Sequence, residues 1–153
     1  MRCGQKKETV RQASPSDSGV LANLAVQLWE HASAEELEKE FKELTGADDA
    51  ACFIKYAGGE PVGFAQCGLR YDYVEGTDSS PVGYLEGIFV LPQYRKLGYA
   101  AEMLACCENW AKERRCTEFA SDCELENSGS YEFHTAMGFE EANRIICFRK
   151  SLN

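Results

Sequence analysis

The sequence contains only four prolines, two histidines and 16 basic residues, and each shortage excludes a class of protein. With 44% hydrophobic residues, 11% aromatic residues and so few prolines, the composition is that of a folded protein and not of a disordered one. No segment reaches the roughly 18 consecutive apolar residues that a membrane-spanning helix requires. A chain of 153 residues encloses one core but is too short for two ordinary domains. We therefore expect one soluble domain over residues 1–153, with no membrane partner.

The sequence also lacks the patterns of a metal site, a disulfide framework and an export signal. His31 and His134 lie far apart and no C-x-x-C pair occurs, so we expect no metal. Most of the eight cysteines, Cys147 included, lie in apolar segments, where we expect reduced thiols packed in a core. The first ten residues are polar and lack the apolar stretch of a secretory signal. These features predict a cytoplasmic protein.

The charge balance is acidic, because 25 aspartates and glutamates exceed the 16 lysines and arginines and give a net charge of -9. Such a surface attracts cations and repels the phosphates of nucleic acids, so we expect no nucleic-acid partner. An acidic surface also favours solubility without any ligand. Charge alone therefore does not choose between a cationic ligand and none.

The first half of the chain predicts a strand, two helices and a hairpin. Ser33 and Glu36 form a capping-box pattern at the start of the second helix, and Gly58-Gly59 permits a tight turn between two strands. The predicted elements are a strand at 9–13, a helix capped by residues 14–17 and ending near Trp29, a helix at 34–44, and strands at 50–56 and 61–69.

The second half predicts strands that alternate with helices. The predicted elements are a polar, acidic loop at 70–81, a strand at 82–90, a helix at 99–112, a short strand at 118–123, a helix at 128–137 closed by Gly138, and a terminal hairpin of 139–142 with 145–150. Parallel pairing of the strands that flank the helix at 99–112 would complete a right-handed β-α-β crossover. The predicted fold class is therefore α/β with a mixed sheet.

The segment with the clearest chemistry joins a strand, a basic turn and a helix start. The strand ends in Val90-Leu91-Pro92, and the turn carries Arg95, Lys96 and Gly98 before the helix begins at Tyr99. Unpaired N–H groups at a helix N-terminus offer several donors to a pyrophosphate, and a glycine lets the backbone approach it closely. The R-x-x-G-x-A pattern by itself is weak, because three fixed positions recur by chance. Its position between a strand and an amphipathic helix makes it specific.

In that setting the segment resembles the acetyl-coenzyme A motif of the GCN5-related N-acetyltransferases. Asn127, a following helix and Gly138-Phe139-Glu140 resemble the second conserved segment of this superfamily. Within the superfamily the fit is closest to the aminoglycoside 6'-N-acetyltransferases, and it covers nearly the whole chain. The matching segments are Gln27-Leu28-Trp29, Asp72-Tyr73-Val74, Asp78-Ser79-Ser80-Pro81, Leu85-Glu86-Gly87-Ile88-Phe89-Val90 and Ala120-Ser121-Asp122.

The resemblance implies a single-domain fold with a centrally splayed mixed sheet flanked by helices. It implies direct acetyl transfer from the co-substrate acetyl-coenzyme A to a primary amine of a small cationic substrate. That amine would be the 6'-amine of an aminoglycoside antibiotic, so the activity would give antibiotic resistance. It also implies a homodimer. Polyamines or peptide amines are alternative substrates, and a non-catalytic acyl-coenzyme A sensor is an alternative from another class.

Carried over residue by residue, the resemblance implies two adjoining sites. The cofactor site would comprise the backbones of Ile88 and Val90 for the pantetheine arm, Arg95, Lys96, Gly98, Ala100 and Ala101 around the pyrophosphate, and Asn127 on the pantetheine arm. The substrate pocket would comprise Trp29, Tyr73, Glu86 and Asp122. By default an aromatic residue such as Trp29 belongs to the core, and a flat ring beside carboxylates also packs well against a sugar or a cation.

Carboxylates suit the chemistry that the resemblance implies. An amine attacks a thioester only when it is neutral, so the site must accept a proton and hold the other positive charges of the substrate. Glu86 alternates with Ile88 and Val90 on one strand face, which is a costly place for an unpartnered carboxylate. We expect Glu86 to accept the proton through water and Asp122 to orient the substrate, although an aspartate there is also a common cap.

The proton donor for the leaving thiolate has three candidate solutions. His134 stands where many superfamily members carry the tyrosine that has this role, four residues before Gly138. His134 would donate the proton, or Tyr131 one turn earlier would, or coenzyme A would leave as a thiolate stabilised by the backbone. A packed histidine without a catalytic role is the structural alternative.

Overall fold

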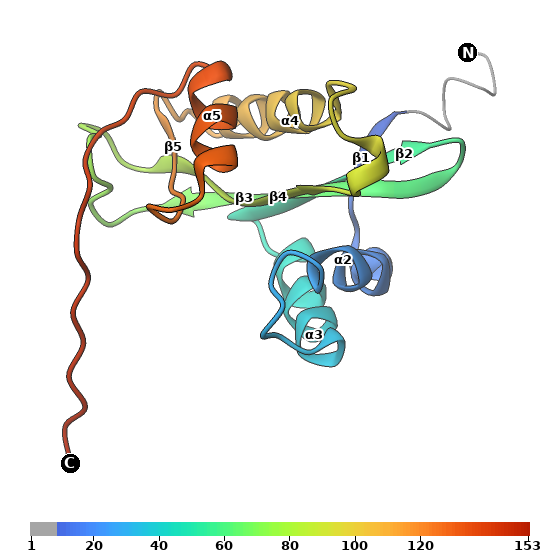
Figure 1. Cartoon of the computed structure of the whole chain (residues 1–153), viewed down its shortest axis with the longest axis horizontal. Helices are drawn as coiled ribbons and strands as arrows, with labels where there is room; N and C mark the ends of the chain where they lie inside the picture. Colours follow the sequence, from blue (N-terminus) through green and yellow to red (C-terminus); the bar gives the residue numbers. More distant parts are fainter. Residues whose placement is uncertain (1–8) are drawn as a thin grey trace.

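A five-stranded sheet lies at the centre of the chain, which the computed structural model describes over residues 9–153 (Figure 1). The strands are β1 (Val10–Gln12), β2 (Ala50–Ala57), β3 (Glu60–Arg70), β4 (Val82–Val90) and β5 (Phe119–Ser121). Their order across the sheet follows the chain, with antiparallel neighbours from β1 to β4 and a parallel pair of β4 with β5. The predicted α/β class and mixed sheet are confirmed. The predicted domain began at residue 1, and residues 1–8 lie outside the described part.

The helices form a layer on each face of the sheet (Figure 1). They are α2 (Ser18–Ala25), α3 (Ala34–Thr45), α4 (Tyr99–Glu113) and α5 (Ser128–Ala136), with short 3-10 turns η1 (Pro15–Asp17) and η2 (Pro92–Tyr94). The helices α2 and α3 cover one face, and α4 and α5 cover the other. The parallel strands β4 and β5 are thus connected across the face that α4 covers, as the sequence predicted.

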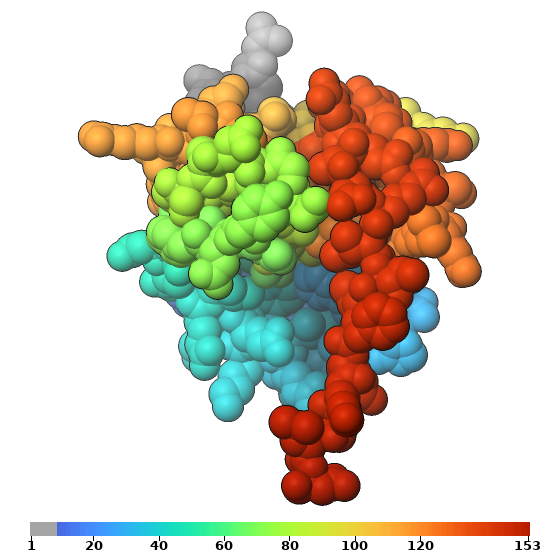
Figure 2. Space-filling model, turned by 90° about the vertical axis from the view of Figure 1, so that its left-hand side faces the viewer, coloured from blue at the N-terminus to red at the C-terminus, as the bar shows by residue number. Residues whose placement is uncertain are grey.

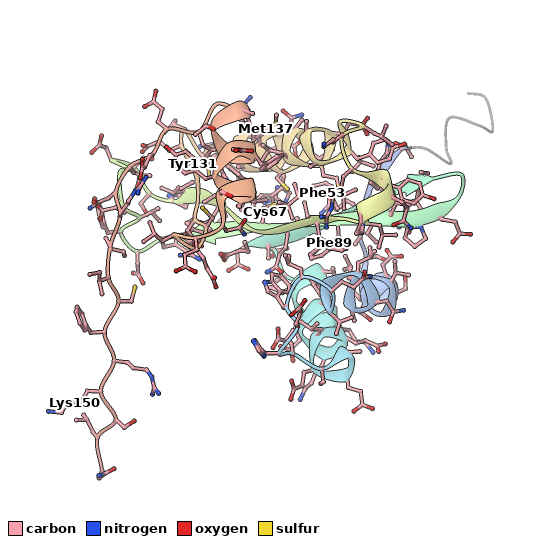
Figure 3. All side chains as sticks on the ribbon, viewed as in Figure 1. Phe53, Cys67, Phe89, Tyr131, Met137 and Lys150 are labelled. Atoms are coloured by element: carbon pink, nitrogen blue, oxygen red, sulfur yellow. The ribbon has the colours of Figure 1, made fainter. Side chains whose placement is uncertain are left out.

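Each face of the sheet has its own hydrophobic core (Figure 3). Phe53 and Cys67 belong to the core under α4, which the helix fills with a buried stripe at helical spacing. Phe89 belongs to the core under α2 and α3. The buried residues of α4 are Met103, Leu104, Cys107, Trp110 and Ala111. These cores fix α4, and with it the loop that precedes α4, against the sheet.

Most local signals in the sequence are confirmed. Ser33 Oγ accepts from the N–H of Glu36 at 3.2 Å, and the Glu36 carboxylate accepts from the N–H of Ser33 at 3.4 Å, which completes the capping box of α3. Gly58 and Gly59 have positive φ angles in the β2–β3 turn. The helix expected to end near Trp29 is shorter, because α2 ends at Ala25 and hydrogen-bonded turns follow it.

A register shift interrupts β4 at Glu86. Cys67 on β3 pairs with Leu85, but the next residue, Gln66, pairs with Gly87, which leaves Glu86 as the additional residue of a β-bulge. Leu85 and Val90 therefore contribute to the same core although they are five residues apart. The prediction that Glu86 alternates regularly with Ile88 and Val90 was wrong, because a bulge shifts the period of two.

The strands β4 and β5 separate soon after they pair. Their bridges join only Gly83–Leu85 with Phe119–Ser121. Beyond this point β4 continues to Val90, whereas β5 has ended and the chain turns toward α5. Backbone groups on the second half of β4 therefore have no strand beside them on the β5 side. This is the splay that the resemblance implied.

The predicted terminal hairpin was wrong. Beyond Gly138 the chain contains no strand, and residues 139–153 form an extended tail. Phe139 still packs against the core and Asn143 bonds to Glu75, after which the tail runs away from the sheet (Figures 1 and 2). The apolar side chains beyond Asn143 are exposed: Ile145 69%, Ile146 81%, Phe148 90% and Leu152 88%. Alternation correctly predicts an extended backbone, but two strands without a covering layer are marginal in water.

The thiols follow the same division between core and tail. Cys52, Cys67 and Cys107 are buried and free, as expected of reduced core cysteines. Cys147 is exposed on the tail, which contradicts its predicted burial. Within residues 9–153, no helix is both long and apolar enough to span a membrane.

Candidate active site

The loop before α4 forms a concave arrangement of backbone N–H groups. Lys96 and Gly98 both adopt left-handed conformations, with φ angles of 64° and 82°. The first hydrogen bond within the helix runs from Glu102 N–H to the Gly98 carbonyl at 3.1 Å, so the amides of residues 99–101 precede the helical ladder. A Cβ at Gly98 would meet no atom within 4 Å, which shows that this position faces open space. Such alternating conformations at a helix N-terminus suit an anion.

Arg95 attaches this loop to the end of β4. Its Nε donates to the carbonyl of Val90 at 2.8 Å, and its guanidinium carbon lies 5.5 Å from the centre of the Phe89 ring. The sequence predicted Arg95 as a charge near the pyrophosphate. The structure gives it a bracing contact, which keeps a positive charge close to the loop.

The backbone of β4 points into the splay at Ile88 and Val90. Leu91 N–H bonds to the Val62 carbonyl at 2.8 Å, on the β3 side. Successive backbone groups of a strand point to opposite sides, so those of Val90 and Ile88 point away from β3. On that side β5 has already ended. The Val90 carbonyl accepts from Arg95, and the Val90 N–H and the backbone groups of Ile88 are placed to pair with an extended amide-bearing ligand.

A buried cation supports the first turn of α4. Lys55 on β2 is 3% exposed, and its Nζ lies 2.6 Å from Glu102 Oε2 and 4.5 Å from the centre of the Tyr99 ring. Lysine is rarely buried unless it is paired. This contact fixes the turn that supplies the unpaired amides. Sequence reasoning missed Lys55, although a lysine inside the apolar run of β2 is a recognisable signal.

The two predicted acidic residues belong to one chain of contacts. Arg70, the last residue of β3, places its Nη2 2.5 and 3.2 Å from the two carboxylate oxygens of Glu86. The Arg70 guanidinium carbon lies 3.5 Å from the centre of the Tyr84 ring, and the Tyr84 hydroxyl donates to the carboxylate of Asp122. Burial and the bond to Asp122 raise the pKa of Tyr84, which keeps the phenol neutral. Glu86 and Asp122 are therefore connected through Arg70 and Tyr84.

An open pocket of about 600 Å³ lies around Trp29, after the end of α2. Its lining residues are Leu28, Trp29, Glu30, His31, Ala32, Glu36 and Glu124. The Trp29 ring packs near Phe41 and Phe64, and a Cβ at Gly87 would lie 2.6 Å from it. Trp29 thus packs in the core, lies close to Gly87 on β4, and also lines the pocket. Three carboxylates in the lining give the pocket the character of a cation site.

Tyr73 and Asn127 have local partners. Tyr73 is 75% exposed on the β3–β4 loop, and its hydroxyl accepts from Gly76 N–H at 3.4 Å. Asn127 caps α5, because its Oδ1 accepts from Ser130 N–H at 3.0 Å. The contacts within residues 9–153 do not connect Tyr73 with Trp29 or Glu86. The predicted roles of Tyr73 and Asn127 toward ligands stay predictions.

His134 connects α5 with the end of β5. Its Nδ1 lies 2.7 Å from the Ser130 carbonyl, and its Nε2 lies 2.8 Å from the hydroxyl of Ser121. A carbonyl only accepts, so Nδ1 carries a proton. The hydroxyl of Tyr131, the alternative donor, instead bonds to Glu141 at 3.3 Å. His134 is therefore the donor candidate nearer the splay, since Ser121 is the last residue paired with β4.

The buried thiols do not offer a nucleophile. Burial raises the pKa of Cys52 to about 12, and a hydrogen bond with Cys67 together with burial raises the pKa of Cys107 well above its usual range. Both thiols stay protonated near neutral pH and inert. Within residues 9–153, no cluster of three or more histidine, cysteine or acidic side chains is arranged to hold a metal ion.

Comparison with known proteins shows similarity to one family of enzymes. The profile of the acetyltransferase (GNAT) family matches residues 20–139. The aminoglycoside N(6')-acetyltransferase type 1 of Stenotrophomonas maltophilia is 43% identical over 144 residues, or 94% of each chain. The enzyme of the same name from Salmonella typhimurium is 41% identical over 141 residues, covering 92% of this chain and 97% of its own.

Solved structures share the fold as well as the sequence. Aminoglycoside N-acetyltransferase AAC(6')-Iy in complex with coenzyme A is 40% identical, with a TM-score of 0.90 and 94% of each chain covered. The same enzyme with the bisubstrate analogue CoA-S-monomethyl-acetylneamine has a TM-score of 0.89, with 94% of this chain and 97% of that chain covered. AAC(6')-Ih from Acinetobacter baumannii is 36% identical, with a TM-score of 0.88 over 95% of this chain and 99% of its own.

Proposed function

Because the chain belongs to the acetyltransferase (GNAT) family, we propose that it acetylates the 6'-amine of aminoglycoside antibiotics with acetyl-coenzyme A and so confers resistance to them. The observation that carries this proposal is the arrangement along β4. The backbone N–H groups from Lys96 to Ala101, the anion cradle, follow its C-terminal end. An open splay borders its second half, and the carboxylate of Glu86 lies at its bulge. These are the three parts that transfer from an anionic thioester to a cationic amine requires.

The residues present fit acetyl-coenzyme A. The left-handed backbone at Lys96 and Gly98 and the unpaired amides at the start of α4 suit the pyrophosphate, with Arg95, Ala100 and Ala101 beside them. The backbones of Ile88 and Val90 face the splay, where they would pair with the pantetheine arm, and Asn127 would border it from α5. When bound, the cofactor supplies the thioester whose acetyl group is transferred.

We infer that Glu86 and Asp122 divide the work on the substrate. Glu86 would accept, through water, the proton that the ammonium loses before its nitrogen attacks the thioester carbonyl. A C–N bond then forms and the C–S bond breaks. Asp122, held by Tyr84, would orient the remaining ammonium groups together with Trp29, and Tyr73 would approach from the β3–β4 loop.

His134 would supply the proton for the departing sulfur. In the imidazolium form both ring nitrogens donate, Nδ1 to the Ser130 carbonyl and Nε2 to Ser121 Oγ. Ser121 would pass its own hydroxyl proton to the sulfur and take the proton of Nε2. Replacing Ser121 with alanine removes this relay but leaves His134 in place.

A thiol-release assay with acetyl-coenzyme A tests the proposed function. Release that requires an amine, with acetylation at the 6'-position of an aminoglycoside by mass spectrometry and NMR, is the expected result. Turnover of linear polyamines or peptide amines instead would assign the alternative substrates. Coenzyme A binding without turnover of any amine would indicate a sensor.

We also propose a cytoplasmic homodimer in which the exposed tail is covered by a second copy of the chain. The exposed apolar side chains at Ile145, Ile146, Phe148 and Leu152 support this, because one copy leaves them in water. The free thiols support a reducing compartment. Sedimentation should give a dimer that Phe148→Asp weakens, and a wild-type monomer at micromolar concentration would contradict the proposal.

A further inference from the structure

Arg70 is the cation in the middle of the acidic site. Its guanidinium bonds to Glu86 and stacks on Tyr84, whose hydroxyl in turn bonds to Asp122. A single arginine therefore contacts the proposed proton acceptor and, through one ring, reaches the proposed substrate-orienting aspartate. A substrate ammonium that loses its proton to Glu86 through water competes with this guanidinium for the same carboxylate.

The ion pair is accessible to water. The side chain of Arg70 is 44% exposed and that of Glu86 is 30% exposed. Ion pairs open to solvent contribute little, because water and other ions compete for each partner. Arg70 can therefore leave Glu86 without the penalty of stranding a buried charge. Its flexible stem lets the guanidinium move while the strand stays in place.

We propose that Arg70 substitutes for the substrate ammonium in the empty site and is displaced when a polycationic amine binds. The inference rests on the proposed function, since it assigns the substrate to Glu86. In the empty enzyme the arginine balances the Glu86 charge and covers the Tyr84 ring. Only enzyme molecules in which Arg70 has left Glu86 bind substrate there. The apparent affinity for the substrate therefore equals the intrinsic affinity multiplied by the fraction of such molecules.

This competition lowers the apparent affinity of every amine that binds at Glu86 by the same factor. A monoamine that displaces Arg70 gains contact with one carboxylate, that of Glu86. A polyamine also gains contacts with the acidic pocket lining, where Glu30, Glu36 and Glu124 lie beside Trp29. Arg70 thus sets the affinity that an amine needs in order to bind at Glu86, and a polyamine reaches it through its additional contacts.

The test removes the charge and keeps the stem. In Arg70→Met we expect both KM and the calorimetric Kd for an aminoglycoside to fall, by about two- to fivefold, the range of a weak exposed ion pair. Arg70→Lys should retain most of the competition and lie between wild type and Arg70→Met. Turnover of the same aminoglycoside by the wild-type enzyme is measured first. A wild-type enzyme without turnover would overturn the proposed function, whereas the KM and Kd of the Arg70 variants test the role of Arg70.

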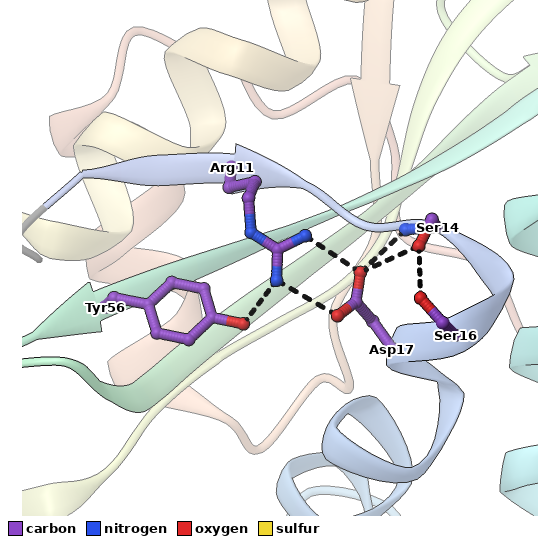
Figure 4. A network of polar contacts seen from close by, with 5 residues as sticks. All are labelled: Arg11, Ser14, Ser16, Asp17 and Tyr56. Carbon is purple, nitrogen blue, oxygen red and sulfur yellow. Dashed lines mark hydrogen bonds and ion pairs between the residues drawn. The ribbon is translucent and has the colours of Figure 1, made fainter. Parts of the chain in front are cut away.

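Arg11 offers a matched control. It is 48% exposed, pairs with Asp17 at 3.0 Å and contacts Tyr56, so its surroundings are similar to those of Arg70 (Figure 4). It lies on β1, at the opposite edge of the sheet from β5. Arg11→Met should leave KM unchanged. An unchanged or raised KM in Arg70→Met would overturn the proposal. If kcat also falls while KM stays constant, Arg70 positions Glu86 and does not compete with the substrate.

Discussion

Gly98 provides the sharpest test of the anion cradle, because its replacement separates backbone strain from ligand exclusion. Its φ angle is 82°, and an added Cβ would meet no protein atom within 4 Å. The Gly98→Ala variant therefore carries the strain of a left-handed alanine but no steric clash. That conformation costs roughly 1–2 kcal/mol for a residue with a Cβ. For a chain of this length, a loss of about 1 kcal/mol lowers Tm by about 2–4 °C.

Gly59 is a control with nearly identical backbone geometry. Its φ angle is 85°, it too has no atom within 4 Å of an added Cβ, and it lies in the β2–β3 turn. Gly59→Ala should therefore lower Tm about as much as Gly98→Ala. Only Gly98→Ala should weaken coenzyme A binding, because only there does the new side chain point into the proposed pyrophosphate site.

Calorimetric titration with coenzyme A gives the deciding comparison. We expect Gly98→Ala to raise Kd by about tenfold or more, equivalent to about 1.4 kcal/mol, and Gly98→Trp to abolish binding in a protein that still folds. Gly59→Ala should bind as wild type does. Equal affinities for the Gly98 and Gly59 variants would refute the position of the cradle, whatever the changes in Tm.

Three further predictions address the acidic site and its support. Glu86→Gln should lower kcat by roughly 100-fold or more at neutral pH with near-normal coenzyme A affinity, and higher pH should restore the rate; full kcat with only a raised KM would make Glu86 a binding residue. Asp122→Asn should reduce kcat/KM more for a tetra-amine than for a monoamine, and equal losses would show that Asp122 does not sense charge. In urea unfolding, Glu102→Ala should cost about 1–3 kcal/mol because it removes the carboxylate that lies 2.6 Å from the Nζ of buried Lys55, whereas Lys55→Met leaves a half-exposed Glu102 and should cost less; the reverse order would contradict this account.

The elements of the fold were predictable because their signals are local. The capping box at Ser33 and Glu36 and the glycine pair at Gly58-Gly59 involve residues that are neighbours in sequence. The tail at 139–153 was not, because alternation specifies an extended backbone but not its partner. A segment that one copy of the chain does not cover gives the same periodic pattern as an internal strand.

The candidate site was likewise predictable only where its signals lie close together in the sequence. The cradle around Lys96 and Gly98 is continuous in sequence, so the motif located it. The sequence did not predict Arg70 and Tyr84 as site residues, because their importance arises from contacts with Glu86 and Asp122 across strands. No spacing along the chain encodes such contacts, and an arginine at a strand end is ordinary in isolation.

The bulge at Glu86 explains why a water relay suits this site better than direct proton transfer. The bulge places the carboxylate outside the regular alternation that directs Ile88 and Val90. In a regular strand the Cα atoms of Glu86 and Ile88 would lie about 6.6 Å apart, at 3.3 Å per residue. A direct hydrogen bond spans only about 2.6–3.2 Å between heavy atoms. With the thioester placed along the Ile88 backbone, as proposed, we expect the attacking amine to lie beyond direct reach of Glu86 and to lose its proton to this carboxylate through one water.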